Sequence, residues 1–409
     1  MSPQPFIPFN RPEIDDAEIA EVVGTLRSGW LTTGERTHRF EREFREYIGA
    51  PHALAVSSAT AALHVSLAAL GVGPGDEVIT TPLTFCATVA VILHVGATPV
   101  LADVLPDGNI DPESIVSRIT PRTKAIIPVH LAGAPCDMDA IWKLAREHKL
   151  FVIEDAAHAA GTLYQGRKFG DASFPSDAVC FSFYATKNMT TGEGGMVAVN
   201  DAALANRIKM LTLHGINKDA WNRYSEDGNW YYEVHELGFK YNLSDIQSAI
   251  GIHQLRKLER FVETRTRFAR LFDQLLADVE EVERPEPVRD GRHAWHLYAL
   301  RLNLEKLTIN RSQFISELKK RNVGASVHFI PIPMHPFFAK WAHLPGNQCP
   351  NAMKMYPRLV SLPLYPSMTE QEVRYVADSV REIALQFKKP APTINTIWQG
   401  MPTARVAQG

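Results

Sequence analysis

The segments VIEDAAHAAG, residues 152–161, and FSFYATKNMTTGEGG, residues 181–195, carry most of the information about this fold. Each begins as a short apolar run, which is typical of a buried strand, and then becomes polar. The first strand ends in Asp155, and the second leads through Ser182 to Lys187 and several glycines. In parallel α/β sheets, ligands bind beyond the carboxyl ends of the strands. We therefore expect Asp155 and Lys187 to lie at one ligand-binding edge of a parallel sheet.

Short apolar runs alternate with helical patterns on both sides of these segments. The expected strands are residues 53–56, 77–80, 100–103, 125–129, 151–154, 179–183 and 196–199, and the expected helices are residues 59–70, 84–95 and 139–148. Strands that are separated by helices indicate a mostly parallel sheet covered on both faces. The expected fold class is therefore α/β, with this sheet in a large domain.

A long amphipathic helix is expected from about residue 244, because apolar residues recur every three or four positions through SDIQSAIGIHQLRKLERFVETRTRFARLFDQLL. A single core rarely exceeds about 250–300 residues, so a chain of 409 residues should hold two domains. The elements expected in a small C-terminal α+β domain are strands at residues 298–302 and 325–329 and helices at residues 311–321 and from Thr369. We expect a large domain over residues 1–250, the linking helix and small domain over 251–388, and a tail over 389–409.

The composition is that of a globular enzyme acting on a small molecule. Hydrophobic residues make up 45% and charged residues 22% of the chain, and the formal net charge is −2. This charge, with no cluster of Lys and Arg, argues against a nucleic-acid partner. The four cysteines are far apart, so we expect no disulfide framework. Without a signal-peptide pattern or an apolar run of about 18 residues, we expect a cytoplasmic protein that does not insert into membranes.

Further motifs place polar and aromatic groups at the same edge of the predicted sheet. Ser58, Ala59 and Thr60 lie where a strand runs into a helix, and a helix N-terminus attracts phosphate. Phe85 follows the next strand and could stack on a planar ring. Asp155, if buried, needs a cationic partner, which a protonated pyridine nitrogen would supply.

Taken singly, each motif has an ordinary alternative. Asp155 could cap the following turn, and Ser58 could be a plain helix N-cap. Phe85 could belong to the core. Lys187 could be a surface lysine in a flexible loop, whereas a desolvated lysine would have a lowered pKa and a nucleophilic amine. The order of the motifs along the chain is more informative than any one of them.

That order resembles the DegT/DnrJ/EryC1/StrS family, the sugar-nucleotide aminotransferases with the aspartate-aminotransferase fold. The resemblance extends over nearly the whole chain, through SGWLTTG, SSATAAL, GDEVITTPLTF, AIIPVHLAG, VIEDAAHAAG, FSFYATKN, GFKYNLSDIQSAIG and SLPLYP. It implies a fold-type I transferase that depends on pyridoxal 5′-phosphate. Within the family, aminotransferases for UDP-4-keto sugars resemble this chain most, although Phe85 and a long insert at residues 217–232 depart from them.

The resemblance implies roles for the residues at matching positions. Lys187 matches the lysine that holds the cofactor as a Schiff base, and Asp155 matches the acid on the pyridine nitrogen. His158 matches the residue that hydrogen-bonds the ring hydroxyl, and Phe85 matches the aromatic that stacks on the ring. The residues that match the phosphate site are Ser58, Ala59, Thr60 and Ser182, together with Asn242 from a neighbouring subunit. A homodimer with shared active sites is therefore implied.

The implied reaction transfers the amino group of L-glutamate to a keto-sugar nucleotide in polysaccharide, lipopolysaccharide or amino-sugar biosynthesis. A nucleotide needs cationic and polar partners, for which Arg223, Lys240 and His328 are the candidates, with residues 217–232 as a substrate flap. Family dehydratases have histidine in place of Lys187, so a sugar 3-dehydratase-like enzyme is the weaker alternative. A non-catalytic regulator with the same fold is another.

Two other motifs have weaker functional interpretations. GVGPGD, residues 71–76, follows a helix and precedes a strand, which is the wrong order for a dinucleotide-binding loop. His293 and His296, in HAWH, have a spacing that could hold a metal, but no carboxylate cluster accompanies them. We expect these histidines to contact the core or the substrate, and no metal site.

Overall fold

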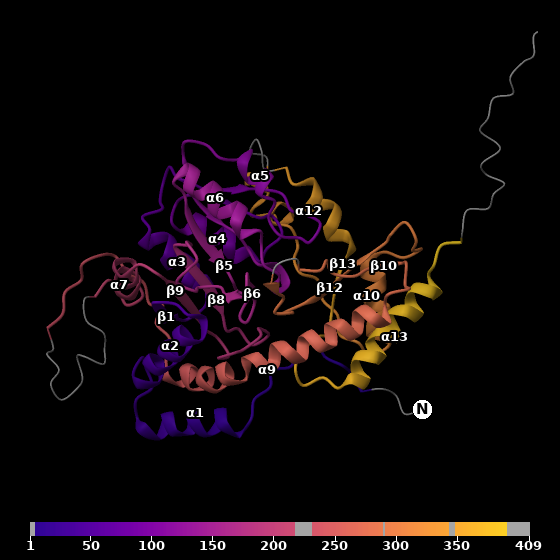
Figure 1. The fold of residues 1–409 in the computed structure, drawn as a ribbon, viewed down its shortest axis with the longest axis horizontal. Coiled ribbons are helices and arrows are strands. Elements are labelled where there is room, and N and C mark those ends of the chain that lie inside the picture. The colour runs from indigo at the N-terminus through magenta and orange to yellow at the C-terminus, as the bar shows by residue number, and fades with distance from the viewer. Residues whose placement is uncertain (1–4, 217–230, 289–290, 343–347, 391–409) are drawn as a thin grey trace, which may run out of the picture.

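The structure is a computed structural model that describes residues 5–216, 231–288, 291–342 and 348–390 (Figure 1). A seven-stranded sheet with the order β1-β9-β8-β5-β4-β2-β3 forms the centre of its larger part. The strands are β1 (His52–Val56), β2 (Glu77–Thr80), β3 (Thr98–Leu101), β4 (Thr123–Ile127), β5 (Phe151–Asp155), β8 (Ala178–Ser182) and β9 (Gly195–Val199). Only β9 runs against its neighbours in this sheet, and the pairs from β8 to β3 are all parallel. The expected mostly parallel sheet is confirmed, with strand ends displaced by up to two residues.

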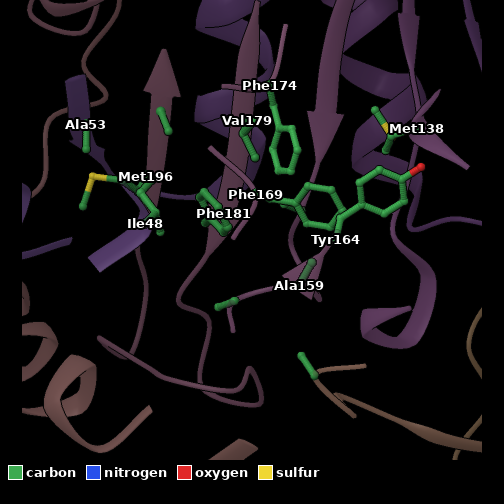
Figure 2. Close-up of a cluster of buried hydrophobic side chains, with 14 of the residues drawn as sticks. Ile48, Ala53, Met138, Ala159, Tyr164, Phe169, Phe174, Val179, Phe181 and Met196 are labelled. Carbon is green, nitrogen blue, oxygen red and sulfur yellow. The ribbon is translucent and has the colours of Figure 1, made fainter. Parts of the chain in front are cut away.

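Helices cover both faces of this sheet, as the alternation of strands and helices predicts. They are α1 (Asp16–Ser28), α2 (Glu35–Ile48), α3 (Ala59–Ala69), α4 (Cys86–His94), α5 (Pro112–Val116), α6 (Met138–His148) and α7 (Ala202–Leu211). Neighbouring residues of one strand belong to different cores: Ile126 of β4 packs in the cluster with α2 and α6, and Ile127 packs in the cluster with α3 and α7. Figure 2 shows the first cluster, where Phe169, Phe174 and Phe181 lie together. Burial on both faces explains why these strands are almost entirely apolar.

The helix α9 (Asp245–Leu275) connects the larger part to a smaller one. It begins at Ser244, whose side chain forms a reciprocal capping box with Gln247. Its first half packs on α1 and α2 and its second half on α13 (Glu370–Gln386), so it runs beneath both parts in Figure 1. No helix in the described ranges is long and apolar enough to cross a membrane.

The smaller part is an α+β unit with its own hydrophobic core. An antiparallel sheet of order β10-β12-β13 packs with α10 and α13. Its elements are β10 (Val282–Glu283), β12 (Tyr298–Leu302), α10 (Arg311–Lys320) and β13 (Leu359–Leu362). The remaining short elements are β6 (Leu163–Tyr164), β7 (Arg167–Lys168), η1 (Leu131–Gly133), β11 (Gly291–Arg292), η2 (Ile332–Met334), α11 (Ala339–Ala342), α12 (Pro350–Met355) and η3 (Tyr356–Arg358). Because α9 contributes Leu258 and Val262 to the core of the larger part and Phe268 and Phe272 to that of the smaller part, we propose that the two domains divide along this helix after Val262, beyond the expected boundary at residue 250.

The prediction of a strand at residues 325–329 is wrong. Only Ser326 makes a bridge, to Ser361 of β13, and β13 itself occupies the place of the third strand. His328 and Phe329 instead form part of a cavity wall. The alternating pattern of this stretch arises because some of its side chains line the cavity and one residue forms a bridge. A periodicity of two in the sequence does not distinguish this arrangement from a strand. A smaller difference is that α4 begins after Phe85, two residues later than expected.

Candidate active site

A cavity of about 550 Å³ opens where the parallel strands end. Strands β1, β2, β5 and β8 all deliver residues to it just beyond their carboxyl ends. Its walls include Phe9, Ser58, Ala59, Thr60, Thr84, Phe85, Thr88, Asp155, His158, Ser182, Lys187, Glu193, His296, His328 and Phe329. The sheet edge thus gathers residues that are far apart in the sequence, as expected for a parallel α/β fold.

Nine of the candidate site residues predicted from the sequence line this cavity. They are Ser58, Ala59, Thr60, Phe85, Asp155, His158, Ser182, Lys187 and His328. Lys240 and Asn242 do not line it. Asn242 instead pairs with Val56 at the end of β1, and its Nδ2 donates a hydrogen bond of 2.8 Å to Thr33 Oγ1. Arg223 and most of the expected flap lie outside the described residues.

Asp155 is a buried carboxylate held by two hydrogen-bond donors. Its side chain is 5% exposed, Thr88 Oγ1 donates to Oδ2 over 2.8 Å, and the Ala157 N–H donates to Oδ1 over 3.1 Å. Thr84 in turn hydrogen-bonds Thr88. Burial raises the pKa of Asp155, although both hydrogen bonds oppose that rise. A cationic group brought against this carboxylate would favour its charged form.

Lys187 lies in a structured turn close to Asp155. Its backbone N–H donates to the Tyr184 carbonyl, and the side chain of the next residue, Asn188, donates to the Ala294 carbonyl over 2.7 Å. Burial lowers the pKa of Lys187 to about 8, and the Asp155 charge only partly offsets this. Near neutral pH the neutral, nucleophilic amine is therefore much more abundant than for an ordinary lysine.

His158 presents one defined nitrogen to the cavity. Its side chain is buried, and Nδ1 accepts a hydrogen bond of 3.2 Å from the Ala132 N–H. Burial lowers the pKa of His158 well below its ordinary value, and nearby Lys187 adds to this effect. Because a neutral ring has one N–H, its proton resides on Nε2, which can donate to a ligand. Its ring also stacks on Phe329 at 5.6 Å between centroids.

The mouth of α3 forms a cradle suited to an anion. Ser58 caps the helix, and its Oγ accepts a hydrogen bond from the Ala61 N–H over 3.1 Å. The N–H groups of Ala59 and Thr60 belong to the first turn, which has no intrahelical acceptors. A Cβ on Gly195 would lie 2.6 Å from the Ser58 carbonyl carbon, so only glycine lets β9 approach this helix so closely.

A model of the DegT/DnrJ/EryC1/StrS aminotransferase family matches residues 12–381. The chain belongs to this family. The spore coat polysaccharide biosynthesis protein SpsC of Bacillus subtilis is 49% identical over 380 residues, which cover 92% of this chain and 97% of SpsC.

Solved sugar aminotransferases of this kind also match in structure. The putative sugar aminotransferase Spr1654 of Streptococcus pneumoniae, in its PLP form, has a TM-score of 0.86 at 32% identity, covering 93% of this chain and 99% of Spr1654. Helicobacter pylori PseC, an aminotransferase involved in pseudoaminic acid biosynthesis, has a TM-score of 0.86 at 32% identity, covering 94% and 100%. Spr1654 is also known in a PMP form. The fold is fold-type I, and the cofactor is pyridoxal phosphate.

The residues of the cavity fit this cofactor. Buried Asp155 forms no salt bridge with any described residue, the α3 mouth offers N–H groups suited to a phosphate, and Lys187 supplies an amine. Phe85 is 58% exposed, with its ring 5.9 Å from that of Phe329, so it is free to cover a planar ring.

Sequence reasoning missed Thr88 and Phe9 as cavity residues and left the place of His296 open. Thr88, the direct partner of Asp155, lies three residues after Phe85 in a motif whose recognisable feature is its aromatic. His296 lines the cavity, as one of the two uses expected for the HAWH histidines. His293 does not line it, and its Nδ1 accepts a hydrogen bond from the Trp295 N–H. Phe9 belongs to the N-terminal segment and carried no recognisable motif.

Proposed function

We propose that this protein transfers the amino group of L-glutamate to a keto-sugar nucleotide, most specifically a UDP-4-keto sugar. The observation that carries the proposal is that Lys187 and the buried carboxylate of Asp155 line the same cavity. Burial lowers the pKa of Lys187 to about 8. SpsC belongs to spore coat polysaccharide biosynthesis and PseC to pseudoaminic acid biosynthesis, which supports a role in making amino sugars for polysaccharide or lipopolysaccharide.

We propose a role for each residue that lines the cavity, in agreement with the roles that the family resemblance implies. Bound pyridoxal phosphate supplies an electron sink for the carbon that loses its proton. Lys187 would hold the cofactor, and its Nζ, once free, would take up the donor's α-proton and carry it. Asp155 would hold a protonated ring nitrogen in its charged form, and His158 Nε2 would donate to the ring hydroxyl oxygen. Phe85 covers one face of the ring.

We further propose that two copies of the chain share their active sites. Ser58, Ala59, Thr60 and Ser182 would hold the phosphate within one copy, and Asn242 of the second copy would complete the set. The position of Asn242 supports this arrangement, because its side chain does not reach the cavity of its own chain.

The sugar nucleotide would occupy the open side of the same cavity after the donor has left. Of its three candidate partners, His328 lines the cavity. Lys240 does not, so its contribution would be made to a second copy, as for Asn242. If Arg223 binds the nucleotide, Arg223→Ala should raise the KM for the sugar nucleotide far more than the KM for glutamate.

A half-reaction with L-glutamate alone tests the proposed function. The cofactor-loaded protein should convert its cofactor to the amine form, which an absorption spectrum records, and release 2-oxoglutarate. The loaded amine form should then be reoxidised by one or more members of a panel of keto-sugar nucleotides. A regulator would leave the cofactor unchanged with every amino acid, and that result would overturn the proposal.

Lys187→His separates transamination from the dehydratase alternative. Loss of the lysine removes both the covalent anchor and the proton carrier, so transamination should fall at least about a hundredfold. Lys143→His is the matched control, since Lys143 is exposed on α6. Wild-type protein that releases water from a keto-deoxy sugar nucleotide without amino transfer would favour the dehydratase.

A further inference from the structure

His296 is a buried cavity residue for which the proposed amino transfer has no role so far. Its side chain is 6% exposed, and its ring lies 4.3 Å from the His158 ring, centroid to centroid. Nδ1 is fully enclosed and has no hydrogen-bond partner among the described residues. Nε2 is therefore the nitrogen through which this imidazole can reach a ligand in the cavity. An incompletely satisfied imidazole costs free energy, which a functional role would explain.

Two side chains hold the backbone around His296. Arg265, fully buried on α9, donates through Nη1 to the carbonyls of Trp295 and His296 over 3.2 and 3.3 Å. The same nitrogen donates to the Leu364 carbonyl over 2.5 Å. Asn188, next to Lys187, donates to the Ala294 carbonyl. These bonds fix the imidazole relative to the reactive lysine, as a binding residue requires.

The turn at Gly133 holds the same segment from the other side. The Ala294 N–H donates to the Gly133 carbonyl over 3.1 Å. A Cβ on Gly133 would lie 2.8 Å from the His158 carbonyl oxygen and 3.3 Å from the His296 backbone nitrogen. The two histidines are thus brought together by a turn that admits only glycine, with φ of 96°.

The charges of the cavity show what His296 is suited to bind. Among the described lining residues there is no arginine, and Lys187 is the only lysine. An α-amino acid that donates its amino group brings a carboxylate, which needs hydrogen-bond donors when it leaves water. The α3 mouth is assigned to the cofactor phosphate and His158 Nε2 to the ring hydroxyl. His328 is the candidate partner of the sugar nucleotide, which leaves His296 Nε2 as an imidazole nitrogen that can donate to a carboxylate.

We propose that His296 receives the carboxylate of the amino donor through Nε2. The inference rests on the proposed function and assigns a residue to its first substrate. The sugar nucleotide has no carboxylate on its reacting carbon, so it would not form this contact with the imidazole. His296 therefore distinguishes the two substrates that use the cavity in turn.

Binding of the donor should be linked to uptake of a proton. Burial lowers the pKa of His296 well below its ordinary value, and His158, Lys187, Arg265 and His328 all face it and lower its pKa further. The free imidazole is neutral, and an adjacent carboxylate favours its protonated form. Donor affinity should accordingly be greater at lower pH and fall as pH rises through the pKa of the complex.

The first experiment measures the half-reaction of cofactor-loaded His296→Phe with L-glutamate. This variant keeps a planar ring of similar size and removes the donor. The glutamate concentration at half-saturation should rise about tenfold, while the KM for the keto-sugar nucleotide changes less than about twofold. His148→Asn, on the exposed end of α6, is the control and should leave both unchanged.

The second experiment needs no turnover. Calorimetric titration of the cofactor-loaded protein with glutarate, a dicarboxylate without an amino or keto group, is run in two buffers of different ionisation enthalpy. Wild type should take up a proton on binding, and His296→Phe should bind glutarate about tenfold more weakly with less uptake. His296→Gln, which keeps a neutral donor, should recover much of the affinity.

Equal glutarate affinity in wild type and a folded, cofactor-loaded His296→Phe would overturn the inference. Binding by wild type without proton uptake, or no binding at all, would overturn it as well. Folding and loading are checked by the thermal midpoint and the cofactor spectrum. A wild-type protein that converts no amino donor refutes the proposed function instead, so the two failures are distinguishable.

Discussion

The Thr88 hydroxyl lies 2.8 Å from Asp155 Oδ2 and donates a hydrogen bond to it. Thr88 belongs to α4 and Asp155 ends β5, so a helix that follows one strand orients the acid of another. We expect Thr88→Val to raise the pKa of Asp155 further, because a donor to its charged form is lost. The ring nitrogen would then be less completely protonated.

The half-reaction of Thr88→Val with L-glutamate should slow about tenfold, since a hydrogen bond to a charged group is worth about 1.5–3 kcal/mol. Stopped-flow absorption measures the rate at saturating donor. Thr88→Ser keeps the hydroxyl and is the matched control. A Val variant as fast as wild type would show that the Ala157 N–H alone suffices to orient Asp155.

Capture of pyridoxal phosphate by the cofactor-free protein should depend on pH through Lys187. Its pKa of about 8 lies below the ordinary value for lysine, and only the neutral amine attacks an aldehyde. The capture rate should therefore rise with pH through about 8 and level off above it. Absorption of the bound cofactor measures the rate, and a profile still rising steeply at about pH 10 would contradict the lowered pKa.

Gly195→Ala should weaken cofactor binding and lower the thermal midpoint. The added methyl would meet the Ser58 carbonyl carbon at 2.6 Å, which forces β9 and the α3 mouth apart. Overpacking of this kind costs about 1–3 kcal/mol. Gly73→Ala is the control, because its nearest neighbour would be the Val95 carbonyl oxygen at 3.8 Å. Cofactor titration and thermal unfolding of both variants measure the difference, and equal midpoints would contradict the prediction.

Mixed dimers test whether Asn242 acts across subunits. Lys187→Ala and Asn242→Ala should each impair both sites of a homodimer. A hybrid of the two variants would hold one site with both defects and one site with neither. Mixing and refolding the variants together should therefore restore up to about half of the wild-type turnover per hybrid dimer, which an assay of the separated hybrid measures. Activity no higher than in the parent variants would indicate that Asn242 acts within its own chain or not at all.

The sheet and the ends of its strands were predictable because each is a local pattern. Asp155, Ser182 and Lys187 follow apolar runs directly, and the parallel fold places them at one edge. Thr88 and His296 were not predictable as partners, since each reaches the cavity through packing between distant segments. The stretch ending in Phe329 alternates like a strand, yet its backbone pairing with β13 is limited to the bridge at Ser326. Lys240 and Asn242 were predicted as site residues, but within a single chain they do not line the cavity.

The reversed direction of β9 restricts how this enzyme can be engineered. Ser182 pairs with Gly195, so residues 183–194, which carry Lys187, form the loop of a hairpin. The antiparallel pairing of β8 with β9 fixes both ends of this loop. An insertion or deletion of one residue within it would displace Lys187 or turn the side chains of β9 toward the wrong core. Substrate range is therefore best altered by exchanging walls of the cavity that come from the small domain, and grafts between relatives should retain the length of residues 183–194.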